Sequence, residues 1–100
     1  MPVVSVTIVP LGTATPSVSK YVAGVERVLR ASGLKHELNG MGTIIEGELD
    51  AILSVIRKMH EQPFLDGVVR VSTLIRIDDR RDKEGSIEAK IRSVKEKLGE

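Results

Sequence analysis

Residues 67–78 read GVVRVSTLIRID, and their alternation of apolar and polar side chains decides the fold. Successive side chains of a β-strand point to opposite sides, so this segment is expected to be a strand with one apolar face on the core. That face is expected to carry Val69, Val71, Thr73, Ile75 and Ile77, and the opposite, open face Val68, Arg70, Ser72, Leu74 and Arg76.

Three more strands and three helices are predicted from the same kind of pattern, all three strands and two of the helices before this segment and one helix after it. Residues 3–10 are rich in β-branched side chains and predict a strand that ends at the sequence PLG. Apolar residues recur at helical spacing from Val18 to Leu29, and Gly33 is a typical helix stop. Residues 34–39 and 43–49 are expected to be short strands, joined by a turn at 39–42 into a hairpin.

A further helix is expected to begin after the hairpin, with Asp50 as its cap, and to be broken by residues 63–67. A last helix follows the final strand. The order β-α-β-β-α-β plus a C-terminal helix predicts one ferredoxin-like α+β domain over residues 1–100. The expected buried stripes are Ile52, Val55, Ile56 and Met59 in the middle helix and Ile87, Ile91, Val94 and Leu98 in the last.

Composition excludes several classes of function. The chain has no cysteine, which rules out disulfides, thiolate metal sites and cysteine nucleophiles. Its net charge of +1 gives no field to attract nucleic acid or an anionic membrane. The first and third strands lack the aromatic residues on which RNA bases stack. No signal peptide or membrane-spanning run of about 20 apolar residues is recognised, so we expect a soluble, cytoplasmic protein.

No catalytic constellation is apparent, so we expect a binding protein and not an enzyme. His36 and His60 lie on different predicted elements, and neither has a nucleophile or a paired acid beside it in the pattern. Both are expected to be structural or exposed. Asp78, Asp79 and Asp82 could hold a hard cation, although a solvated connector is the simpler interpretation.

The open face of the sheet has two interpretations. Period-two alternation places Glu46 and Glu48 on the same surface as Arg70 and Arg76. This surface is either a solvated face with cross-strand ion pairs or a subunit interface. Apolar Val9, Val68 and Leu74 on the same side indicate that something covers part of it. Aromatic residues make up only 2% of the chain, so its core has few large side chains, and association of subunits would bury more apolar surface.

Several segments in this order and spacing resemble the family of small thiamine-binding proteins. They are residues 10–13 (PLGT), Ser19 with 21–23 (YVA), 40–43 (GMGT) with Glu46, 60–61 (HE) and 77–82 (IDDRRD). The resemblance covers nearly the whole chain. It implies a ferredoxin-like fold, pairing of subunits by their sheets into dimers or tetramers, and binding of thiamine or its hydroxymethylpyrimidine part without known catalysis.

The resemblance also directs attention to a site near the hairpin turn and the end of the first strand, at a subunit boundary. A binder of thiamine needs a carboxylate near the cation or amine, hydroxyl groups and apolar walls. The alternatives are ordinary hairpin chemistry for Thr43 and an ion pair with Arg70 for Glu46. The predicted ligand-binding residues are Thr13, Ser19, Asn39, Met41, Thr43 and Glu46.

A second function fits the same fold. Ferredoxin-like modules bind various small molecules at subunit interfaces, so the chain is alternatively a regulatory or structural oligomer that senses an amino acid or an anion. An enzyme is the weakest of the three hypotheses, because no base–nucleophile or paired-acid set can be assembled.

Overall fold

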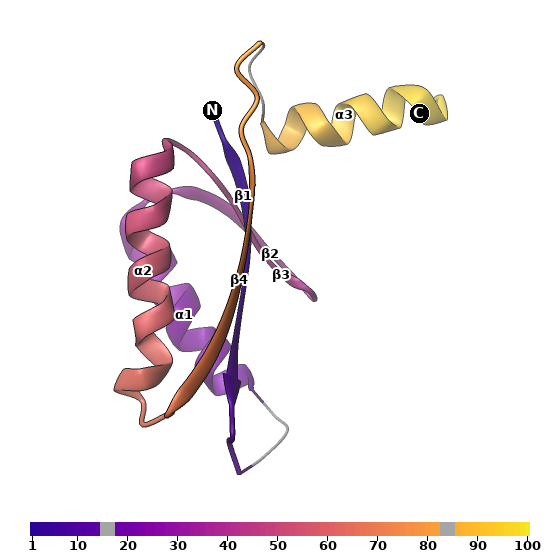
Figure 1. Ribbon diagram of the computed structural model, residues 1–100. Helices are drawn as coiled ribbons and strands as arrows, with labels where there is room; N and C mark the ends of the chain where they lie inside the picture. The colour runs from indigo at the N-terminus through magenta and orange to yellow at the C-terminus, as the bar shows by residue number, and fades with distance from the viewer. Residues whose placement is uncertain (15–17, 83–85) are drawn as a thin grey trace.

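A four-stranded antiparallel sheet with two helices on one face forms the body of the protein, and a third helix projects from the other side (Figure 1). The structure, a computed structural model, describes residues 1–14, 18–82 and 86–100. Its elements are β1 (Val3–Leu11), α1 (Ser19–Ser32), β2 (Lys35–Asn39), β3 (Gly42–Glu46), α2 (Leu49–Leu65), β4 (Arg70–Asp78) and α3 (Ile87–Leu98). The predicted ferredoxin-like α+β fold is confirmed.

The strand order in the sheet is β2-β3-β1-β4, so β1 is central and β4 is an edge strand. Residues directly opposite one another in an antiparallel pair share a face. Val4 lies opposite Ile45 on one side and Ile77 on the other, and all three face the helices. The core on that face is formed by Val4, Val6, Leu29, Ile45, Ile52, Val55, Ile56 and Met59.

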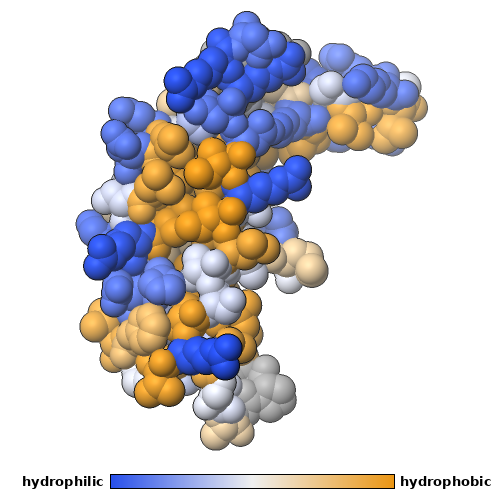
Figure 2. All heavy atoms as spheres, in the orientation of Figure 1, coloured by the Kyte–Doolittle hydropathy of each residue, from blue (hydrophilic) through white to orange (hydrophobic). Residues whose placement is uncertain are grey.

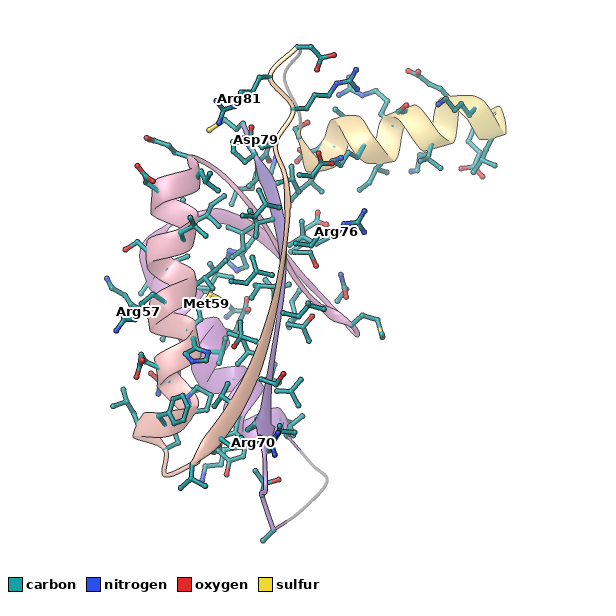
Figure 3. All side chains as sticks on the ribbon, in the orientation of Figure 1. Arg57, Met59, Arg70, Arg76, Asp79 and Arg81 are labelled. Atoms are coloured by element: carbon teal, nitrogen blue, oxygen red, sulfur yellow. The ribbon has the colours of Figure 1, made fainter. Side chains whose placement is uncertain are left out.

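The open face carries the other half of the alternation. Ser5 lies opposite Ile44 and Arg76, and Thr7 lies opposite Leu74. Arg76 projects away from α2 in Figure 3, as the period-two pattern predicts. The pattern therefore assigned the two sides of β4 correctly from Arg70 onward.

The sequence interpretation was wrong at the start of β4. Val68 was expected on the open face, yet it is buried, and Val69, expected on the core face, is 88% exposed. Gly67 adopts a left-handed φ of 92°, and the Val68 amide donates to the Pro63 carbonyl at 3.1 Å. Val68 thus belongs to the turn after α2, and the strand alternation begins two residues later.

Two helix boundaries also differ from the prediction. β3 ends at Glu46, so Glu48 is not a strand residue facing Arg70; it precedes α2, which begins at Leu49 and has Asp50 in its first turn. At its other end α2 continues through Pro63 to Leu65. Pro63 removes the backbone donor that would bond to the Met59 carbonyl, and the helix ends two residues later.

The apolar stripe of α3 is not buried within this chain, contrary to expectation. Only Ile87 is buried, whereas Ile91, Val94 and Leu98 are between 47% and 68% exposed. The helix is attached at its base by two ion pairs, Lys90 to Asp78 and Lys35 to Glu88. Figure 2 shows apolar side chains on one side of α3 as well as on the body of the molecule beside it.

None of the helices in the described part of the chain is both long enough and apolar enough to cross a bilayer.

Candidate functional site

A cavity lies between α1, the β2–β3 hairpin and the second half of β1. We call this cavity the inner pocket; its volume is about 300 Å³. Its walls are mostly aliphatic, from the core-facing side chains of β1 and α1 together with Met59 of α2. Figure 3 places Met59 between α2 and the sheet, at the floor of this region. The polar groups of its lining come from Thr7, Glu26, Asn39 and Thr43.

Of the described residues that line this pocket, only Glu26 is acidic, and it is buried, with 9% of its surface exposed. Its Oε1 lies 2.9 Å from Nε2 of His36 on β2 and 3.5 Å from Nε of Arg30 one turn further along α1. The other ring nitrogen of His36, Nδ1, lies 2.8 Å from the Leu34 carbonyl oxygen. Because a carboxylate and a carbonyl both accept, the ring makes both bonds as a donor only when it carries two protons.

This arrangement gives the pocket a fixed carboxylate with one oxygen still available. Both contacts of Glu26 use Oε1, and no described residue bonds to Oε2. A buried carboxylate surrounded by aliphatic side chains forms strong hydrogen bonds with an N–H donor that enters the cavity. The site can therefore accept a flat, mostly apolar molecule that presents an amine or a cation.

The hairpin turn forms the rim of the pocket. Oδ1 of Asn39 accepts a hydrogen bond from the Met41 amide at 2.8 Å, and the Thr7 hydroxyl donates to the Met41 carbonyl at 3.1 Å. Gly42 has a φ of 149°, and a Cβ there would lie 2.7 Å from Oγ1 of Thr7. Glycine at this position thus lets the hairpin lie directly against β1, which closes one side of the pocket.

Thr43 faces the helices and is 93% buried beside Val6, its partner on β1. Its hydroxyl makes no hydrogen bond with another described residue and lines the pocket. A hydroxyl in such a place can donate to or accept from a ligand.

The structure brings together some of the predicted site residues and separates others. Asn39, Met41 and Thr43 line the inner pocket, while Ser19 lines a neighbouring groove on the outer side of α1. Met41 is 86% exposed, so it lies at the rim of the pocket and is not a buried wall. Thr13 lies beyond the end of β1 and lines neither cavity.

Glu46 is far along β3 from the pocket, at the end opposite the hairpin turn. It is on the open face as predicted, but Oε2 lies 3.2 Å from Nζ of Lys35 on β2, an ion-pair distance without hydrogen-bond geometry. Arg70 is not its partner, because β1 separates β3 from β4. Lys35 also pairs with Glu88, so Glu46 belongs to the charge cluster that attaches α3.

The sequence interpretation missed Glu26, the carboxylate that does line the pocket. A signal was present: Glu26 lies between Val25 and Leu29 on a helix whose apolar residues face the core, and an acidic residue there needs a partner. The partner, His36, lies ten residues away on the next strand and could not be assigned by spacing alone.

The remaining candidate groups have structural roles. Arg80 pairs with Asp82, Arg81 with Asp79, and Asp78 with Lys90, so these carboxylates are engaged in ion pairs. Among the residues that the structure describes, no cluster of three or more His, Cys, Asp or Glu side chains could hold a metal ion. His60 bonds to the Thr73 hydroxyl at 2.7 Å and packs edge-on against Phe64.

Fold and cavity together define a ferredoxin-like domain with an aliphatic pocket and a single carboxylate between its first helix and its hairpin. The chain belongs to the family described as thiamine-binding protein, which matches residues 4–95. It is 52% identical to the UPF0045 protein YqgV of Bacillus subtilis over 98% of both chains.

Solved structures agree on the fold. The hypothetical protein MJ1052 of Methanocaldococcus jannaschii superposes with a TM-score of 0.85 at 43% identity, covering 93% of this chain and 94% of that one. A protein of Thermotoga maritima whose name proposes a role in thiamine biosynthesis or salvage has a TM-score of 0.78, covering 93% and 97%. At 19% identity, this second likeness shows the fold alone.

Proposed function

We propose that this domain binds thiamine or its hydroxymethylpyrimidine part in the inner pocket and does not convert it chemically. The observation that carries the proposal is Glu26, a buried carboxylate whose Oε2 bonds to no described residue, in a cavity with mostly aliphatic walls. The aminopyrimidine is a flat ring with an N–H donor, and it matches that wall in shape and polarity. Membership of the thiamine-binding family supports the same ligand.

The other polar groups of the pocket complete the recognition. The ring amine donates to Oε2 of Glu26, and the ring nitrogens accept from the Thr43 hydroxyl and the side-chain amide of Asn39. The methyl group and the ring faces contact Val6, Ile8 and Met59. Binding without chemistry is proposed because no nucleophile, paired acid or metal cluster is assembled from the described residues lining this pocket.

A thermal-shift screen followed by titration calorimetry tests the proposal. Thiamine and hydroxymethylpyrimidine are compared with amino acids and simple anions, which represent the sensor hypothesis. A ligand at 100 times its dissociation constant adds about 2.7 kcal/mol to the free energy of unfolding. Stabilisation by amino acids alone would support the sensor function and refute thiamine binding.

We also propose that the chain associates with a second copy through the outer edge of β4. This edge has no strand partner among the residues that the structure describes, and Leu74, at the centre of the nine-residue strand, is 71% exposed. The radius of gyration, 15.1 Å, exceeds the roughly 13 Å of a compact 100-residue domain because α3 projects from the body. Exposed apolar surface of this extent is typical of an interaction face.

Charge favours one register for such a pair. If two copies of β4 run antiparallel about Leu74, all nine residues of each strand overlap, and Arg70 lies opposite Asp78 of the second copy at both ends. A shift that centres the pair on Thr73 places Arg70 opposite Arg76, which is repulsive. We therefore propose a two-fold pair centred on Leu74, with the α3 helices available for further contacts.

A further inference from the structure

A second cavity continues the inner pocket along the outer side of α1. We call it the outer groove; its volume is about 550 Å³. It shares four lining residues with the inner pocket, so the two cavities adjoin. The shared residues are Val18, Val22, Glu26 and Leu38, and the groove adds Ser19, Ala23, Arg27 and Arg30.

The two cavities differ in charge. Among the described residues, no lysine or arginine lines the inner pocket, whereas Arg27 and Arg30 line the outer groove, one turn apart on α1. Arg27 forms no ion pair with a described residue, and Arg30 makes one contact, 3.5 Å long, to Glu26. The Arg30 side chain is 73% exposed, so it can turn toward an anion without breaking a buried network.

Glu26 at the junction fixes the direction in which a ligand would extend. In the hydroxymethylpyrimidine, the amino group and the hydroxymethyl group sit on neighbouring ring carbons. An amine bonded to Glu26 therefore leaves the neighbouring substituent close to the junction of the two cavities. Arg27 and Arg30 line the cavity on the other side of that junction.

We infer that the preferred ligand is a phosphate monoester, with its pyrimidine ring in the inner pocket and its phosphate between Arg27 and Arg30. The inference rests on the proposed function, since it uses the same ring position. A guanidinium pair gives the bidentate donors that a phosphate dianion prefers, and the Ser19 hydroxyl lies in the same groove. The contact of His36 with Glu26 reduces the repulsion between that carboxylate and the phosphate.

Titration calorimetry with four ligands tests the inference: hydroxymethylpyrimidine, thiamine and the monophosphate of each. In the unmodified protein hydroxymethylpyrimidine phosphate is expected to bind about tenfold tighter than its parent, with a smaller gain for thiamine monophosphate, whose phosphate lies beyond the thiazolium ring. The gain diminishes with added salt because the arginines are exposed. In the double variant Arg27→Gln/Arg30→Gln the gain disappears, so that each phosphorylated ligand binds no tighter than its own parent does in that variant. Arg57→Gln, on the outer side of α2 and away from both cavities, is the matched control (Figure 3).

Each result bears on a different claim. Tight binding of the parent compounds with no gain from phosphate overturns this inference and leaves the proposed function standing. A gain that persists in the double variant also overturns it, since the phosphate would then lie elsewhere. Failure of all four ligands to bind refutes the proposed function and this inference together. Inorganic phosphate alone is expected to bind weakly, because the ring supplies most of the contact.

Discussion

The carboxylate of Glu26 on α1 and the imidazole of His36 on β2 are joined by a contact of 2.9 Å between Oε1 and Nε2. The turn at Gly33, with a left-handed φ of 74°, brings the two residues together by reversing the chain between them. The pair ties the first helix to an edge strand whose one neighbour in the sheet is β3. It also holds the carboxylate at the wall of the inner pocket, where a mobile side chain would cost more binding entropy to order.

His36→Ala is expected to destabilise the fold by about 1–3 kcal/mol, because it leaves a largely buried carboxylate without its partner. The double variant His36→Ala/Glu26→Gln is expected to recover part of that loss, since a neutral amide costs less to leave unpaired. Urea denaturation followed by circular dichroism measures both. Additive losses in the double variant would show that the two side chains do not interact in solution.

The attachment of α3 is expected to depend on pH. Lys90 beside Asp78 and Lys35 beside Glu88 lower the pKa values of these two carboxyl groups below their ordinary values of 3.8 and 4.5. A carboxyl group whose pKa is lowered by docking favours the docked state above its ordinary pKa and loses that effect as pH falls through the lowered value. The ion pairs therefore hold α3 near neutral pH and release it in acid.

Nuclear magnetic resonance can follow that release residue by residue. Between about pH 6 and about pH 3, backbone shifts of α3 are expected to move toward random-coil values while those of α1 and α2 do not, since a detached 12-residue helix is marginal in water. High salt at neutral pH should have a similar, weaker effect, because both pairs are exposed. Unchanged α3 shifts throughout this range would mean that other contacts hold the helix.

The proposed β4 pair predicts one specific disulfide. The chain has no cysteine, so Leu74→Cys introduces a single thiol, which in a pair centred on residue 74 faces its own copy at roughly 5 Å between Cα atoms. Oxidation is expected to yield a covalent dimer. Ser72→Cys, on the same face of the same strand, places the two thiols on residues roughly 13 Å apart and is expected to remain uncrosslinked.

Charge reversal provides an independent check on that register. Arg70→Glu is expected to weaken association, and adding Asp78→Lys to the same chain is expected to restore it, as measured by light scattering. A monomer of 10.9 kDa at all concentrations in the unmodified protein would refute the pair.

The fold was predictable because periodicity records which side of each element is buried. Residues 70–78 alternate so strictly that their two faces could be assigned before the sheet was known. The errors lie where the backbone departs from regular structure: Gly67 turns the chain, so Val68 is buried against the expected parity, and α2 tolerates Pro63 in its last turns.

The site was only half predictable, for a related reason. Asn39 and Thr43 lie on the hairpin, which could be predicted from the glycines of its turn. Both residues line the inner pocket. Glu46 and Glu26 could not be ranked without the register, because nothing in the sequence says which end of β3 adjoins the first helix. The α3 stripe was misassigned because an amphipathic pattern predicts that a face is covered without identifying what covers it.

The most direct test of the central claim is calorimetric titration of hydroxymethylpyrimidine and thiamine into the unmodified protein, Glu26→Gln and Glu46→Gln, each first shown by circular dichroism to be folded. Glu26→Gln is expected to weaken binding about tenfold to a hundredfold, because a charge-assisted hydrogen bond contributes ~1.5–3 kcal/mol, and Glu46→Gln is expected to leave the affinity unchanged. Equal affinities for Glu26→Gln and the unmodified protein, or a loss confined to Glu46→Gln, would contradict the placement of the ligand in the inner pocket.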